Sequence, residues 1–73
     1  MVEVFRTNVK DRHKAEKLLY QIHKTFRAYQ ANFDLDDCDK ILRVECVNDS
    51  VQPTLLIELL QHNGFSAEVL PDE

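Results

Sequence analysis

The 73-residue sequence predicts an α+β fold of the ferredoxin-like kind, in which a four-stranded antiparallel sheet carries two helices on one face. The hydrophobic pattern changes between a period of two and a period of 3.6 residues in the order β-α-β-β-α-β. Right-handed crossovers through the two helical segments then give a split βαβ sandwich. A chain of this length holds one core, so we expect residues 1–73 to form a single domain.

The first strand is predicted at Val2–Thr7, a run rich in residues that favour β structure. Its inward face is ambiguous, because Val2 and Val4 share one face with Arg6 while Phe5 falls on the other. We expect Val2 and Val4 to face the core. Arg6 then lies near the end of the strand, where its long stem can carry the charge to water.

The first helix is predicted from Arg12 to about Phe26. One apolar stripe runs along it: Ala15, Leu18, Leu19, Ile22 and Phe26. Asp11 is the expected N-cap, because its carboxylate can accept hydrogen bonds from the first-turn amides. Arg12, His13 and Lys14 stand beside the positive end of the helix dipole, where an anion or a partner would compensate them.

Two more strands follow, with an acidic turn between them. The first alternates apolar and polar residues, with Tyr29, Ala31, Phe33 and Leu35 in its apolar phase. The turn is Asp36-Asp37-Cys38-Asp39. The second strand places Leu42, Val44 and Cys46 inward, and its outer face includes Ile41 and Val47.

The second helix follows a loop at Asn48-Asp49-Ser50 and begins with Pro53 at its first position and Gln52 as N-cap. Val51 can pack onto Leu56 as a hydrophobic staple. The predicted buried stripe is Leu55, Leu56, Leu59 and Leu60.

Gly64 stands where a left-handed residue is expected to end the second helix, and Phe65 can then fold back onto Leu60. A last short strand places Phe65, Ala67 and Val69 in one phase. The chain closes with Pro71-Asp72-Glu73.

Charge is divided unevenly along the chain, whose formal net charge is −4 at pH 7. Residues 1–27 hold seven basic and three acidic residues, a net charge of +4, and residues 28–73 hold two basic and ten acidic residues, a net charge of −8. Such asymmetry can steer association or pair two copies front to back. The alternative is that the solvent-exposed faces simply differ in charge and that the asymmetry has no role in binding.

The two cysteines, and the two histidines that lie outside the segment between the first strand and the first helix, predict no reactive site. Cys38 and Cys46 have neither the number nor the spacing of a disulfide framework or a metal site, and we expect them to be reduced. Cys46 should be buried and Cys38 exposed. His23 and His62 fall late in their helices, where a surface position is expected.

Several function classes lack their signatures in this sequence. There is no phosphate-binding glycine loop, no nucleophile with a placed base and no zinc motif, so we expect no enzyme, no catalytic residue and no cofactor. Ferredoxin-like RNA-binding domains place aromatic residues on the open sheet face. Here that face would carry Gln30, Asn32, Arg43 and Glu45, which argues against nucleic acid as the partner.

No apolar run approaches the roughly 20 residues of a membrane span, and Met1 is followed by a strand pattern instead of a signal-peptide core. We therefore expect a cytoplasmic protein without a membrane partner.

The element spacing, Pro53 early in the second helix and Gly64-Phe65 after it resemble the heavy-metal-associated domain of copper chaperones and metal-transporting ATPases. That family carries Gly-Met-x-Cys-x-x-Cys at the first strand–helix joint. Superposing the helix patterns puts Asn8 on the glycine, Val9 on the buried methionine, Asp11 on the first cysteine and Lys14 on the second. The resemblance implies the family's fold. It does not imply Cu(I) binding, because carboxylate and ammonium groups replace the two thiolates.

Together these observations favour a non-catalytic domain that binds another protein, or a second copy of itself, through the basic joint, defined as Lys10, Arg12, His13, Lys14 and Lys17. The candidate binding residues are Lys10, Asp11, Arg12, His13, Lys14, Lys17 and Phe65. The alternative is a metal-binding or trafficking domain of altered preference, in which His13 and a ligand from a partner hold the ion. No metal ligand is predicted within the chain itself.

Overall fold

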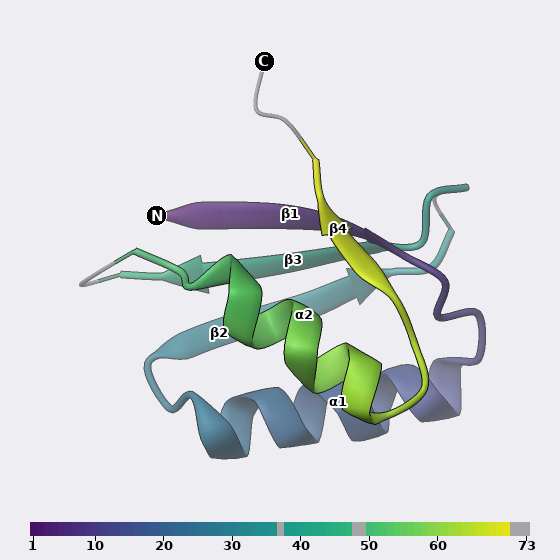
Figure 1. Ribbon diagram of the computed structural model, residues 1–73, viewed down its shortest axis with the longest axis horizontal. Coiled ribbons are helices and arrows are strands. Elements are labelled where there is room, and N and C mark those ends of the chain that lie inside the picture. Colours follow the sequence, from purple (N-terminus) through teal and green to yellow (C-terminus); the bar gives the residue numbers. More distant parts are fainter. Residues whose placement is uncertain (37, 48–49, 71–73) are drawn as a thin grey trace.

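The computed structural model describes residues 1–36, 38–47 and 50–70. Asp37 of the expected acidic turn, Asn48 and Asp49 of the expected loop, and residues 71–73 lie outside the described residues. Six elements follow in the expected order, as Figure 1 shows: β1 (Val2–Thr7), α1 (Arg12–Thr25), β2 (Tyr29–Asp34), β3 (Ile41–Cys46), α2 (Pro53–His62) and β4 (Ala67–Val69).

The strands form one four-stranded sheet in the order β2-β3-β1-β4, and each pair of neighbours is antiparallel. β1 lies between β3 and β4, with Phe5 opposite Leu42 and Arg6 opposite Glu68. The two central strands are therefore contributed by different halves of the chain. This arrangement confirms the predicted ferredoxin-like α+β fold.

One hydrophobic core lies between the sheet and the two helices. Its buried members come from all six elements except β4 and from two flanking segments: Phe5, Val9, Ala15, Leu18, Ile22, Tyr29, Ala31, Leu42, Val44, Cys46, Val51, Leu56 and Leu60. Because residues of both helices and of three strands share this cluster, both helices cover the same face of the sheet. The predicted stripe of the first helix and the inward phase of β3 are confirmed.

The prediction that Val2 and Val4 face the core is wrong. Val2 is 49% exposed and Val4 is half-buried, whereas Phe5 is fully buried and Thr7 nearly so. Period-two alternation shows that a strand has two faces but not which one is buried. The face of β1 that packs against the helices becomes the buried one. They cover the side on which Phe5 meets the inward residues of β3.

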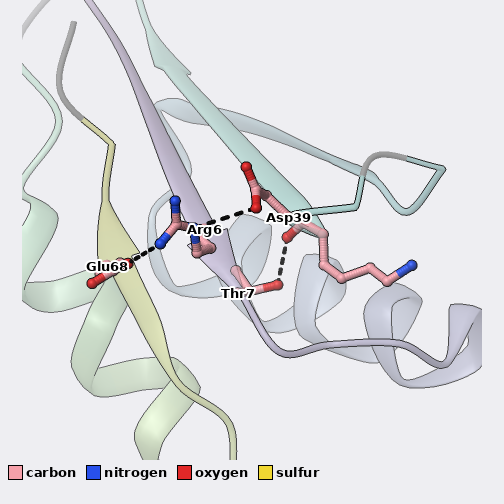
Figure 2. Close-up of polar contacts among 5 residues, drawn as sticks. Arg6, Thr7, Asp39 and Glu68 are labelled. Carbon is pink, nitrogen blue, oxygen red and sulfur yellow. Dashed lines mark hydrogen bonds and ion pairs between the residues drawn. The ribbon is translucent and has the colours of Figure 1, made fainter.

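Arg6 consequently lies on the open face of the sheet. Figure 2 shows its guanidinium between two carboxylates, with Nη1 2.9 Å from Glu68 Oε1 and Nε 3.5 Å from Asp39 Oδ1. These ion pairs join β1 to β4 and to the turn before β3. The prediction that Arg6 lies on the inward face of β1 and extends its stem to water is therefore wrong. Arg6 lies on the open face of the sheet, where it is held by ion pairs.

The buried stripe of α2 is narrower than predicted. Leu56 and Leu60 are fully buried and Leu59 is half-buried, but Leu55 is 44% exposed. Consecutive residues of a helix are rotated by about 100° around its axis. When Leu56 and Leu60 face the core, Leu55 therefore points partly towards solvent. Val69 is also exposed, at 39%, because it is the last residue of β4, an edge strand of the sheet.

Candidate functional site

The basic joint is held at its base by the end of β1. The Val9 amide donates a hydrogen bond to Thr7 Oγ1 at 3.2 Å, and the Val9 side chain is fully buried. An apolar side chain inserted between β1 and α1 fixes the path of residues 8–11. The cations that follow Val9 therefore project from a firmly placed segment.

Asp11 caps α1, as predicted. Its Oδ1 accepts a hydrogen bond from the His13 amide at 2.8 Å, and its carbonyl accepts one from the Ala15 amide at 2.9 Å. Such a cap stabilises a helix by about 1 kcal/mol. The structure thus gives Asp11 a role in positioning the joint.

The C-terminal end of α2, where the loop that carries Phe65 begins, has the geometry expected of a Schellman motif. Gly64 has φ of 87°, the Phe65 amide donates to the Leu60 carbonyl at 2.9 Å, and the Gly64 amide donates to the Gln61 carbonyl at 3.0 Å. The Ser66 amide then donates to Asn8 Oδ1 at 2.9 Å. This last bond ties the loop that carries Phe65 directly to the joint.

A groove lies where α1 meets this loop. It has a volume of about 220 Å³ and is lined by Lys14, Lys17, Leu18, Gln21, Asn63 and Phe65. The Lys14 Nζ lies 6.0 Å from the centroid of the Phe65 ring, within the range of a cation–π contact. Three of the predicted binding residues, Lys14, Lys17 and Phe65, therefore converge on one feature.

A pair of amide side chains forms part of the wall of the groove. Gln21 and Asn63 exchange two hydrogen bonds of 3.1 Å, and Asn63 also donates to the Leu59 carbonyl at 2.8 Å. The sequence pattern did not predict Leu18, Gln21 or Asn63 as site residues. Gln21 lies one and two turns from Lys17 and Lys14 on α1, so helical spacing could have found it. Asn63 could be found only from the packing of α2 on α1.

The other predicted residues do not line this groove. Lys10, Arg12 and His13 are exposed, and His13 lines a neighbouring depression of about 410 Å³ together with Glu16, Lys17, Tyr20 and Gln21. Within residues 1–36, 38–47 and 50–70, both ion pairs belong to Arg6, so no cation of the basic joint is neutralised by another described residue. The first turn of α1 also lacks an acidic residue.

The remaining histidines and cysteines lie apart from the joint. Cys46 is buried and Cys38 is exposed, as expected, and both are free thiols. His23 and His62 are exposed, and His23 Nε2 accepts a hydrogen bond from the Ala31 amide of β2 at 3.1 Å. In the described part of the chain, no three His, Cys, Asp or Glu side chains are grouped as a metal site. A metal site formed by His13 and a partner's ligand stays a prediction.

None of the helices that the structure describes is both long and apolar enough to cross a membrane. In comparisons with known proteins, no family model, no curated protein and no solved structure matches the chain.

Proposed function

We propose that this domain is a non-catalytic, cytoplasmic protein-interaction module, related to the heavy-metal-associated domains but without their metal-binding cysteines. Its contact surface is the basic joint with Phe65, and its partner is the acidic surface of another protein or of a second copy. The relationship is supported by the fully buried Val9 at the position of the family's methionine and by the Pro53 and Gly64-Phe65 marks around α2.

One observation carries the proposal: Lys14 and Lys17 meet Phe65 in a groove, and neither cation has a carboxylate partner among the described residues. An acidic partner would neutralise both ammonium groups and complement the positive end of α1. An apolar side chain of that partner would cover the exposed part of the Phe65 ring.

The test is affinity capture and sedimentation of the charge-reversal variant Arg12→Glu/Lys14→Glu. Its matched control is Arg27→Glu/Arg43→Glu, which makes the same charge change at exposed residues outside the joint. We expect the joint variant to lose its partners, or its self-association, while the control keeps them. Binding by the native chain should also weaken at high salt, because exposed charges are screened. The proposal fails if the joint variant keeps every partner and the same oligomeric state.

A further inference from the structure

The solvent-facing side of α1 carries a continuous stripe of its own. His13, Lys17, Tyr20 and Lys24 are spaced by four, three and four residues and are all exposed. This spacing places them on one helix face, opposite the buried stripe of Ala15, Leu18 and Ile22. Over the 14 residues of α1 the helix is about 21 Å long, so the stripe extends well beyond the basic joint.

Tyr20 is the most exposed phenylalanine or tyrosine in the described part of the chain. Its side chain is 66% exposed, whereas the other aromatic side chains of the chain are buried or half-buried. The Lys24 Nζ lies 5.8 Å from the centroid of its ring. An exposed tyrosine beside a cation offers a large, stiff contact area, which is typical of residues that dominate protein interfaces.

The shape of this surface suits a helix. The groove of about 220 Å³ and the depression of about 410 Å³ share two lining residues, Lys17 and Gln21, which are four residues apart. A ridge of residues four apart with a hollow on each side is the surface that interlocks with a second helix. A second helix would therefore fit this ridge and the two hollows beside it.

The charge of this surface identifies the kind of helix. Lys14, Lys17 and Lys24 lie on or beside the two hollows, and Glu16 is the single acidic residue in their lining. A partner helix with acidic residues along one face complements these cations. Phosphate polymers and anionic lipid surfaces fit less well, because their closely spaced charges would also meet the Glu16 carboxylate, whereas a helix can place an uncharged residue opposite it.

We infer that the exposed face of α1, formed by His13, Lys17, Tyr20 and Lys24 with the hollows beside them, docks an acidic amphipathic helix of a partner protein. The inference rests on the proposed function in that the partner is a protein. It adds the partner's secondary structure and moves the centre of the contact from the start of α1 to Tyr20 and Lys24.

The probe is a synthetic amphipathic helix of about 18 residues, long enough to form a stable helix, with glutamates along one face and leucines beside them. A scrambled peptide of the same composition, a single-stranded RNA and vesicles containing phosphatidylserine are the comparison ligands. Amide chemical shifts and fluorescence anisotropy report the site and the affinity. The full chain is used as the native protein and as Tyr20→Ala/Lys24→Glu, with Arg43→Glu as the control on the open sheet face.

We expect the helical peptide to bind more tightly than the scrambled one and to shift the amides around Lys17, Tyr20 and Lys24. Tyr20→Ala/Lys24→Glu should weaken binding about tenfold or more, as expected of central interface residues, and Arg43→Glu less than about twofold, because Arg43 lies outside the interface. Equal binding of the two peptides, no binding at all, unchanged affinity in the double variant, or binding of only the RNA or the vesicles would each overturn the inference.

A separate variant, Lys10→Glu/Arg12→Glu, distinguishes this inference from the proposed function. If that variant loses the natural partners while Tyr20→Ala/Lys24→Glu keeps them, the basic joint is the contact surface and the helix-docking inference fails alone. If neither variant loses a partner, both fail. If the Tyr20 and Lys24 variant loses the partners and the helical peptide together, the inference stands.

Discussion

Thr7 at the end of β1 and Lys40 just before β3 are joined by a hydrogen bond of 2.6 Å, from Thr7 Oγ1 to the Lys40 carbonyl. Thr7 also accepts the Val9 amide, and its own amide donates to the Asp39 carbonyl at 3.2 Å. One buried threonine thus connects the acidic turn to the start of the basic joint. Figure 2 shows Thr7 pointing to this turn beside the Arg6 ion pairs.

Thr7→Val keeps the shape of the side chain and removes the two hydrogen bonds of Oγ1. We expect a loss of about 1–3 kcal/mol in the free energy of unfolding, because the Val9 amide is left buried without its partner. Urea denaturation measures this loss. Thr54→Val, at an exposed position of α2, is the matched control and should change stability by less than about 0.5 kcal/mol. Equal stability of the two variants would contradict the role given to Thr7.

Lys40 has φ of 50°, the left-handed region that L-residues rarely adopt. We expect Lys40→Gly to be more stable than Lys40→Ala by about 1 kcal/mol, since glycine adopts this conformation without steric cost. Both variants lose the hydrogen bond from Lys40 Nζ to the Leu35 carbonyl. The difference in stability between them therefore reports the backbone conformation alone. Thermal unfolding under identical conditions gives the difference, and an alanine variant as stable as the glycine variant would refute it.

Asn8→Ala should release the loop that carries Phe65, because Asn8 Oδ1 is the acceptor of the Ser66 amide. Amide hydrogen exchange at Ser66 is expected to accelerate, and binding through the groove should weaken. Asn8→Asp keeps an oxygen acceptor at the same place and serves as the control that restores protection. If Ser66 exchanges at the same rate in both variants, the side chain of Asn8 does not hold the loop.

His23→Ala should remove the acceptor of the Ala31 amide on β2, an edge strand of the sheet. We expect faster exchange of the Ala31 amide and a loss of about 1 kcal/mol in stability, typical of one hydrogen bond. His62→Ala, at an exposed residue in the last turn of α2, should leave that amide protected. Unchanged exchange at Ala31 in His23→Ala would rule out the bond as its source of protection.

Titration of the reduced domain with Cu(I) and with Zn(II), followed by native mass spectrometry, should show no stoichiometric complex. The reason is the donor set at the joint, where Asp11 and Lys14 replace the family's cysteines and an ammonium group offers no lone pair. A one-to-one complex that disappears in His13→Ala would instead favour metal trafficking over the interaction module.

Local sequence determined the order of the elements and most of their boundaries. The Asp11 cap, Pro53 at the start of α2 and Gly64 after its end act within about one helical turn, so a linear pattern is enough to read them. The inward phases of β2 and β3 were also clear from period-two alternation. The candidate residues Lys14 and Phe65 could be named from the sequence because each lies beside one of these boundaries, and Lys17 because it follows Lys14 by three residues on the same helix.

Tertiary structure decided what depends on segments far apart in the chain. The buried face of β1 was set by which side the helices cover, which made Phe5 a core residue instead of Val2. The groove exists because α1 packs against the end of α2, where Gln21 meets Asn63.

Folding also brings together charges that lie far apart in the sequence. The hydrogen bond from Thr7 to Lys40 holds the turn before β3 beside the end of β1, where Arg6 forms ion pairs with Asp39 and with Glu68. Hydrophobic periodicity and helix caps depend on contacts between residues a few positions apart, so they can be read from the sequence. Which face of a strand packs against a helix depends on contacts between distant segments, and these form only in the folded chain.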